Sequence, residues 1–284
     1  MIAIPGYKSL IPIYESENSI VYRGRRDQDD GPVILKSLKK DYPTPEEFAR
    51  YKHEYGILRN LNQRYQDCTS HIIVVYALEK YEGTPILVME DFGAESLKRL
   101  MVSQEFTLSE MLNIAIQISQ GLTQVHAAHM IHKDINPSNI ALNLSDRQVR
   151  LIDFGIAELA TPSPESPTSH AAFHTSHLEG TLAYISPEQT GRMNRPTDYR
   201  SDFYSLGVTL YELFTGHLPF EADDPMKLVH AHIAKTPVSP HETVVSDNWI
   251  FPERCVILLI FWEQKIFFRR NIMMALVQIF CPNC

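Results

Sequence analysis

The sequence predicts an α+β fold with two lobes, a small β-rich lobe with one helix and a larger helical lobe. Three observations predict it: short β-rich runs fill the first ninety or so residues, one capped helix interrupts them, and helical periodicity dominates from Ser96 onward. The 284 residues are enough for two lobes with a sizeable core. We expect the first lobe over residues 1–90, the second over 91–242 and an atypical tail over 243–284.

The expected strands of the first lobe are runs rich in β-branched and aromatic residues. They cover residues 19–24, 32–36, 72–78 and 85–90. A polar turn over residues 27–31 separates the first two runs, as expected for neighbouring strands.

A helix is expected to begin after Thr44. Thr44 suits the N-cap, Pro45 suits the first helical position, and Glu47 stands where a capping-box acid belongs. Four apolar residues then recur at helical spacing and give this helix one apolar face: Phe48, Tyr51, Tyr55 and Leu58.

The second lobe is expected to hold a long helix over residues 108–128 and a buried central helix over 202–215, which is apolar nearly all round. The first of these carries an apolar stripe that predicts core residues: Met111, Ile114, Ile118, Leu122 and Val125. A strand-like run, 148–152, precedes Asp153. Residues 160–178 are rich in Ser, Thr, Pro and His without periodicity, which indicates a long loop.

The composition excludes several classes of function. A net charge of −8 and a pI near 5.8 argue against nucleic acid as a partner, since phosphate binding needs a basic face. We expect neither a signal peptide nor a membrane span, because the start lacks a charged segment before an apolar core and apolar runs stay short of about 18 residues. Four scattered cysteines do not form a disulfide scaffold, and Cys281 and Cys284 are expected to be reduced thiols, so a cytoplasmic location follows.

Three side chains suggest a metal site in the second lobe. Asp134, Asn139 and Asp153 supply two carboxylates and an amide from loops beside short strands, and such oxygen ligands suit Mg²⁺. Taken singly, each residue also fits an ordinary turn or strand end. The ordered set of all three favours the metal site.

This ordered set resembles the protein kinase family, in register from about Ile13 to Pro240. The motifs that carry the resemblance are Val33-Ile34-Leu35-Lys36, Glu54 in the capped helix, Met89-Glu90-Asp91-Phe92, His132-Lys133-Asp134-Ile135-Asn136-Pro137-Ser138-Asn139, Asp153-Phe154-Gly155, Gly180-Thr181 with Tyr184 and Ser186-Pro187-Glu188, and Asp202-Phe203-Tyr204-Ser205-Leu206-Gly207. The last motif resembles the start of the buried helix that anchors the catalytic loop. The resemblance implies the two-lobed protein kinase fold.

The resemblance also implies roles in phosphoryl transfer. Lys36 would hold the α- and β-phosphates of ATP, with Glu54 as its ion-pair partner. Asp153 and Asn139 would bind Mg²⁺. Asp134 would accept the proton of the substrate hydroxyl and orient that hydroxyl for in-line attack.

Further residues would bind the nucleotide: Ile13, Val21, Lys36, Met89, Glu90, Phe92 and Leu142. Val21 and Leu142 would sandwich the adenine, and residues 89–92 would form the hinge. Thr181 favours serine or threonine as the acceptor.

His126, His129 and His132 lie three residues apart, which also admits a zinc site, but the resemblance accounts for His126 and His132 without a metal.

The sequence departs from the family pattern around this site. Tyr14, Ser16 and Ser19 stand at the three positions of the glycine-rich loop, Ile34 replaces an alanine, and Asn136 replaces a lysine. Lys133 replaces an arginine, and a lysine attracts phosphate only as a point charge. That replacement argues against control by loop phosphorylation, for which the candidate residues are Thr168, Thr175 and Ser176.

The C-terminal part departs most. No motif supplies the arginine that should pair with Glu188, and residues 243–284 are apolar without a clean period, so we expect an incomplete second lobe after a frameshift or truncation near residue 243. The sequence of residues 179–195 resembles that of eukaryotic-like kinase domains found at the N-terminus of large bacterial multidomain sensor kinases. This chain would then be an N-terminal fragment with downstream signalling domains as partners.

The leading hypothesis is an ATP- and Mg²⁺-dependent serine/threonine protein kinase that phosphorylates protein substrates in signal transduction. The alternative is a nucleotide-binding pseudokinase or scaffold without turnover, which the absent glycines and the damaged second lobe favour. A third reading, a small-molecule kinase, is disfavoured because residues 180–188 resemble a protein-docking segment.

Overall fold

The structure, a computed structural model, describes residues 4–39, 43–66, 69–160, 182–193 and 195–240. The chain divides into two compact units. The sheet unit contains the described residues up to Glu95 together with 141–157, and the helical unit contains 96–140 with the described residues from Glu158 onward. The expected tail, most of the expected loop over 160–178, Thr181 and the three candidate phosphorylation sites lie outside the described residues.

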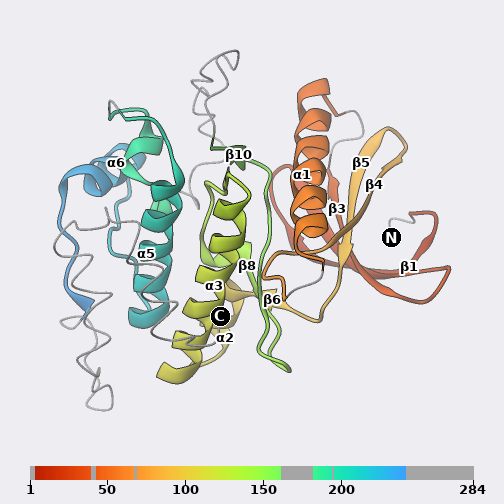
Figure 1. Cartoon of the computed structure of the whole chain (residues 1–284), viewed down its shortest axis with the longest axis horizontal. Helices are drawn as coiled ribbons and strands as arrows, with labels where there is room; N and C mark the ends of the chain where they lie inside the picture. The colour runs from red at the N-terminus through yellow and green to blue at the C-terminus, as the bar shows by residue number, and fades with distance from the viewer. Residues whose placement is uncertain (1–3, 40–42, 67–68, 161–181, 194, 241–284) are drawn as a thin grey trace. The chain divides into compact units, whose positions relative to one another are not determined.

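The sheet unit is built on a five-stranded antiparallel sheet in the order β1-β2-β3-β5-β4 (Figure 1). Its strands are β1 (Tyr7–Glu15), β2 (Ser19–Arg26), β3 (Pro32–Leu38), β4 (Val75–Tyr81) and β5 (Thr84–Glu90). The helix α1 (Pro45–Arg64) packs against β4 and β5, and the short strands β8 (Ile140–Leu142) and β9 (Val149–Leu151) are hydrogen-bonded neighbours. The predicted β-rich first part with one helix is confirmed.

The prediction of one strand was wrong in its bounds, and another strand was not predicted. The strand expected over residues 72–78 begins only at Val75, because the amide of Asn62 accepts from the Val75 amide at 2.9 Å and donates to the Ile73 carbonyl at 3.0 Å. Ile72 instead forms an isolated parallel bridge with Leu151. Strand β1 was not expected at all, since two register irregularities break its pairing with β2 and most of its residues are exposed.

The cap of helix α1 forms as predicted. The Glu47 amide donates to the Thr44 hydroxyl at 3.2 Å, and the Thr44 amide donates to the Glu47 carboxylate at 2.8 Å. The predicted apolar face places Tyr51 and Leu58 in the core, and Glu54, only 2% exposed, lies on the same buried face. The helix therefore carries a buried carboxylate toward the sheet.

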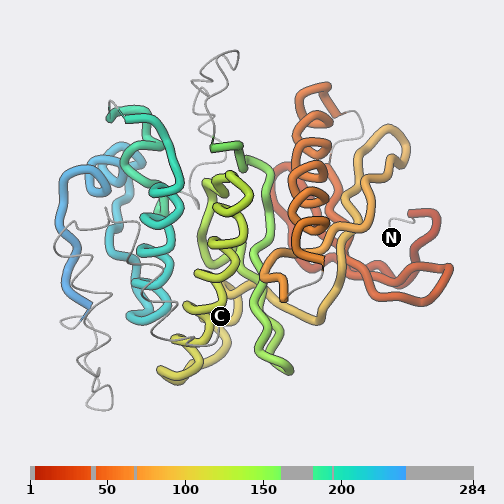
Figure 2. Tube along the Cα trace, in the orientation of Figure 1, coloured from red at the N-terminus to blue at the C-terminus, as the bar shows by residue number. Residues whose placement is uncertain are grey.

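The helical unit holds the longer helices α3 (Leu108–Ala127) and α5 (Tyr199–Thr215), which pack side by side (Figure 2). Its other elements are β6 (Glu95–Ser96, which begins at the last residue of the sheet unit), α2 (Leu97–Ser103), β7 (Met130–Ile131), the 3₁₀ helix η1 (Pro137–Asn139), β10 (Glu158–Leu159), the 3₁₀ helices η3 (Leu182–Tyr184) and η4 (Pro187–Thr190), and α6 (Pro225–Ala234). All five predicted stripe residues of α3 are buried.

Helix α5 begins three residues before its predicted start because Asp198 caps it by accepting from the Arg200 amide. In the ranges the structure describes, no helix is long and apolar enough to cross a bilayer.

A buried histidine in α6 should make the stability of the chain depend on acid pH. His232 is 4% exposed, its Nδ1 lies 2.9 Å from the Tyr204 hydroxyl, and burial lowers its pKa to about 4. The unfolded chain takes up this proton near pH 6.5 and the folded chain only near pH 4, so stability is complete above pH 6.5 and falls as the pH is lowered through that window, by up to about 3 kcal/mol. Urea unfolding of the wild type and of His232→Gln at several pH values measures the difference. Equal slopes for both proteins between pH 6.5 and 4 would contradict the prediction.

Candidate functional site

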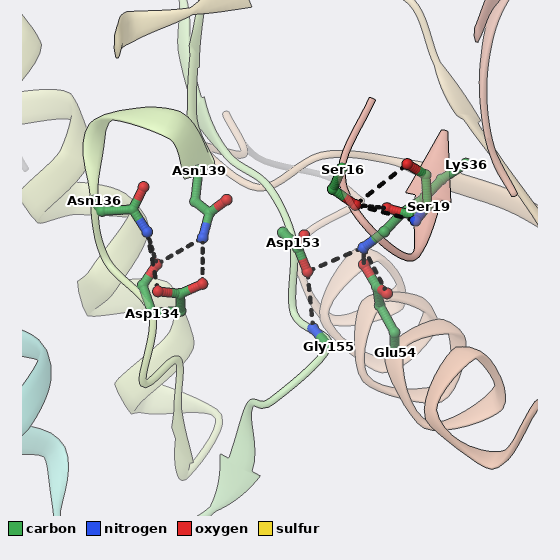
Figure 3. Close-up of polar contacts among 9 residues, drawn as sticks. All are labelled: Ser16, Ser19, Lys36, Glu54, Asp134, Asn136, Asn139, Asp153 and Gly155. Atoms are coloured by element: carbon green, nitrogen blue, oxygen red, sulfur yellow. Dashed lines mark hydrogen bonds and ion pairs between the residues drawn. The ribbon is translucent and has the colours of Figure 1, made fainter. Parts of the chain in front are cut away.

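The sheet unit gathers one ammonium and two carboxylates around Lys36 of β3 (Figure 3). The Lys36 Nζ lies 3.0 Å from both carboxylate oxygens of Glu54 and 3.0 Å from Oδ1 of Asp153. An ammonium group has three N–H donors, so these contacts match its whole donor capacity. The Lys36 side chain is 13% exposed and that of Glu54 2%, whereas that of Asp153 is 43% exposed. The cluster is therefore buried on the helix side and open to solvent at Asp153.

Burial and charge oppose one another at Lys36. Burial alone would lower the pKa of Lys36, but the carboxylates of Asp153 and Glu54 outweigh it and raise that pKa above its ordinary value. The ring of Tyr51, one turn before Glu54 on α1, lies 6.0 Å from the ammonium. Burial raises the pKa of Tyr51, so its hydroxyl stays neutral. Lys36 is thus a fixed positive charge at neutral pH.

The backbone around Asp153 turns sharply to bring its carboxylate to Lys36. Asp153 follows β9 with a φ of 62°, a left-handed conformation uncommon outside glycine. Its Oδ1 accepts from the Gly155 amide at 3.2 Å. A Cβ on Gly155 would lie 3.2 Å from that same oxygen, so a larger residue there would have to shift the Asp153 carboxylate by a few tenths of an ångström. Phe154, fully buried, anchors the turn.

In the helical unit, two amides orient the carboxylate of Asp134 (Figure 3). Asn136 Nδ2 donates to Asp134 Oδ1 at 2.9 Å, and Asn139 Nδ2 donates to Asp134 Oδ2 at 2.7 Å and to the Asp134 carbonyl at 2.9 Å. The Asn136 Oδ1 accepts from the Ser138 amide at 2.9 Å and so caps η1. Each carboxylate oxygen has a donor, which fixes the plane of the group.

Helix α5 holds this loop through hydrogen bonds to the Asp202 carboxylate. Asp202 is not among the predicted site residues. Asp202 is fully buried, and its carboxylate accepts from the amides of His132 at 2.9 Å and Lys133 at 2.7 Å. His126 Nε2 lies 2.8 Å from the same carboxylate, so this histidine, one of the three considered for zinc, is engaged by Asp202. The resemblance had indicated that this helix anchors the loop, but the contacts themselves needed the fold.

Strand register puts several of the predicted nucleotide-binding residues on one face of the sheet. Val21 of β2 is directly opposite Lys36, and Met89 of β5 is directly opposite Ile34, two residues before Lys36. Since paired residues and residues two apart share a face, these four side chains lie on the same side of the sheet. Ile13 lies where the β1–β2 register is irregular.

The remaining predicted nucleotide-binding residues have partners of their own within the sheet unit. The Glu90 carboxylate pairs with Arg150 and accepts from the Val74 amide at 2.7 Å. The Arg150 guanidinium stacks 4.7 Å from the Phe92 ring, and Leu142 is 1% exposed. Their predicted role toward adenine stays a prediction.

Serine side chains close the β1–β2 turn where the family pattern expects glycines (Figure 3). The Ser16 hydroxyl accepts from the Ser19 amide at 3.0 Å and lies 2.9 Å from the Ser19 hydroxyl. The Ser16 amide donates to the Ser19 carbonyl at 2.8 Å. Tyr14, directly opposite Val21, is 58% exposed. The turn is therefore held by hydroxyl groups without backbone conformations that only glycine adopts.

Each cluster, taken by itself, offers groups whose chemistry suits phosphate or a hard divalent cation. Lys36 offers a positive charge for phosphate, and the half-exposed Asp153 offers carboxylate oxygens. Both bonds from Asn139 to Asp134 use its amide nitrogen, so neither of them uses its amide oxygen, an atom type that suits a hard cation. If the Asn139 side chain were turned over, its oxygen would face the carboxylate and carbonyl oxygens of Asp134, and oxygen atoms that only accept hydrogen bonds would then face one another. The orientation with the nitrogen toward Asp134 is therefore the physical one.

Comparison with known proteins identifies the relatives of this chain. The family described as Protein kinase domain matches residues 12–259. The serine/threonine-protein kinase PknL of Mycobacterium tuberculosis is 34% identical over 217 residues, which cover 76% of this chain and 50% of PknL. The serine/threonine-protein kinase pkn3 of Myxococcus xanthus is 31% identical over 226 residues, which cover 78% of this chain and 39% of that relative. The chain thus spans half or less of the length of these curated relatives.

Proposed function

We propose, because this chain belongs to the protein kinase family, that it transfers the γ-phosphoryl group of ATP to serine and threonine hydroxyls of protein substrates in signal transduction. The observation that carries the proposal is the ammonium of Lys36 held by Glu54 and Asp153 at 3.0 Å. The names of the two bacterial relatives support serine and threonine as acceptors.

Lys36 would bind the α- and β-phosphates, and Glu54 would keep its ammonium directed at them. Asp153 and Asn139 would hold the divalent cation, which we propose to be Mg²⁺. When bound, that cation neutralises the negative charge of the phosphates. The residues of this chain supply position and electrostatics, which carry most of the catalysis in phosphoryl transfer.

Asp134 would accept the proton of the attacking hydroxyl and orient that hydroxyl. Its carboxylate is fixed by Asn136 and Asn139, and both act as donors. Because two hydrogen bonds fix the plane of this carboxylate, we propose orientation of the hydroxyl as its larger contribution. Ile13, Val21, Met89, Glu90, Phe92 and Leu142 are the proposed contacts to the rest of the nucleotide.

No observation on the described residues favours the alternative of a scaffold without turnover. A scaffold needs few of Lys36, Glu54, Asp134, Asn139 and Asp153, and all five are present. The proposal includes a cytoplasmic location and downstream signalling domains as partners, on the grounds of composition and of the resemblance given above.

A transfer assay tests the proposal. The purified chain is incubated with γ-labelled ATP, Mg²⁺ and a generic protein substrate, beside Asp153→Asn, and the labelled amino acid is identified after hydrolysis. We expect phosphoserine and phosphothreonine with the wild type, and label lower by at least about 10²-fold with the variant. Thermal stabilisation by ATP without any transfer would favour the scaffold, and label on tyrosine would overturn the acceptor class.

A further inference from the structure

Arg23 of β2 connects that strand to residues 91–94, the segment that follows β5 in the chain. Its Nη2 donates to the Ala94 carbonyl at 2.7 Å, and its Nε lies 2.9 Å from Oδ2 of Asp91. The side chain of Asp91 is 9% exposed and that of Arg23 34% exposed, so the ion pair is shielded from solvent at its carboxylate. A planar guanidinium with five N–H donors suits such a double contact. One side chain thus holds both ends of a four-residue segment.

Asp91 extends this restraint to the middle of the segment. Its Oδ1 accepts from the Gly93 amide at 3.0 Å, while its Oδ2 faces Arg23. Gly93 has a φ of 75°, a left-handed conformation that glycine adopts at little cost. The Phe92 carbonyl accepts from Asn143 Nδ2. Each of the four residues therefore takes part in at least one of these contacts, and the backbone of the segment is fixed along its length.

Arg23 also lies on the face of the sheet that carries Lys36. It is directly opposite Ile34 of β3, which in turn is directly opposite Met89 of β5. Val21 and Arg23 are two residues apart in β2 and therefore share this face. The row of Arg23, Ile34 and Met89 thus runs beside the row that contains Val21 and Lys36. The contacts of Arg23 are made on the side of the sheet where the nucleotide contacts are proposed.

We propose that Arg23 is a positioning residue that, together with Asp91, fixes the backbone of residues 91–94 and thereby raises the affinity of the chain for ATP. We call this pair of residues the brace. The inference rests on the proposed function, in which residues of the segment 89–92 contact the nucleotide, and it adds a residue that is not among the predicted site residues. A segment that is ordered before binding loses less conformational freedom when the ligand binds. Arg23 acts through the segment and needs no contact of its own with the nucleotide.

The affinity of the full chain for a non-hydrolysable ATP analogue with Mg²⁺ tests the brace without turnover. We expect Arg23→Met to raise the Kd measured by calorimetry about tenfold. Arg25→Met is the matched control, because Arg25 is in the same strand and likewise contacts one carbonyl and one carboxylate, both of Asp30. These contacts join Arg25 to an exposed turn and not to residues 91–94, so its Kd should equal that of the wild type. Equal Kd values for the two variants overturn the proposal.

A double-mutant cycle tests whether Arg23 and Asp91 act as one unit. Asp91→Ala should raise the Kd at least as much as Arg23→Met does, since it also removes the acceptor of the Gly93 amide. The double variant should raise the Kd by less than the product of the two single effects, because residues in contact are energetically coupled. A double variant that shows the full product would mean that the two residues act independently, and it overturns the brace.

Kinetics and hydrogen exchange separate the brace from the proposed function. The kcat of Arg23→Met at saturating ATP should stay within about twofold of the wild type while the KM for ATP rises, and a kcat lowered tenfold at unchanged KM overturns the proposal. Without nucleotide, the amides of residues 91–94 should exchange faster in Arg23→Met than in Arg25→Met, and equal rates overturn the brace. Absence of all phosphoryl transfer by the wild type would refute the proposed function, while the Kd values and exchange rates would still decide on the brace.

Discussion

Replacing Lys36 with methionine should lower the free energy of unfolding by about 3–5 kcal/mol, because it leaves the Glu54 carboxylate buried without its counter-charge. Glu54 is 2% exposed and both its oxygens face the lost ammonium at 3.0 Å. Asp153, 43% exposed, can be solvated and should contribute less to the loss. Phosphoryl transfer should also fall by at least about 10²-fold. Urea unfolding and the transfer assay measure the two effects.

The double variant Lys36→Met with Glu54→Met separates stability from activity. Replacing both members of a buried ion pair with apolar residues of similar size is often neutral or stabilising, so most of the lost stability should return. Activity should not return, since no ammonium remains for the phosphates. A double variant as unstable as Lys36→Met alone would mean that the buried charge of Glu54 is not the cause.

Replacing Asp202 with asparagine should cost about 3 kcal/mol or more of stability and lower kcat at least about tenfold. The carboxylate of Asp202 accepts from two backbone amides and lies 2.8 Å from the His126 ring nitrogen. An asparagine offers one acceptor oxygen, and its NH₂ group would face a donor. The loop that carries Asp134 would therefore lose part of its support. Thermal unfolding and kcat at saturating ATP measure both effects.

Asp198→Asn is the matched control on the same helix. Asp198 caps α5 by accepting from the Arg200 amide at 2.8 Å, and asparagine is an equally good N-cap. Its ion pair with Arg200 is partly exposed, so the change should cost less than about 1 kcal/mol. Equal losses for the two variants would show that a buried acceptor at Asp202 is not what holds the loop.

Local chemistry explains which parts of the fold were predictable. The N-cap at Thr44 and the stripe of α3 follow from short-range patterns, and the structure contains both. The predicted start of β4 was wrong because it depends on Asn62 of α1, whose side-chain amide forms hydrogen bonds with the backbone of residues 73 and 75. The sequence pattern within the strand does not indicate such a partner. The same holds for β1, whose irregular register leaves no alternating signal.

The candidate site shows a similar division. The residue types and their order pointed to Asp134 and Asp153 as candidates, and the resemblance added Lys36. The register of β2, β3 and β5 puts Val21 and Met89 on the Lys36 face. The partners of Lys133 were not predictable, because Glu158 and Gln189 are far from it in sequence and their side chains meet it only through the β10–β7 ladder and η4. Lys133 stands where the family pattern has an arginine, and its ammonium pairs with Glu158 at 2.9 Å.

The full engagement of the Lys36 ammonium has a thermodynamic consequence. Its donors face three carboxylate oxygens, one of which belongs to Asp153. A partner that draws Asp153 away therefore releases a donor on Lys36, and an anion that occupies this donor releases Asp153 in turn. Binding at the two residues is then positively cooperative, and linkage requires that each event strengthen the other by the same factor. Asp153 is in this sense the resident competitor of any anion that binds to Lys36.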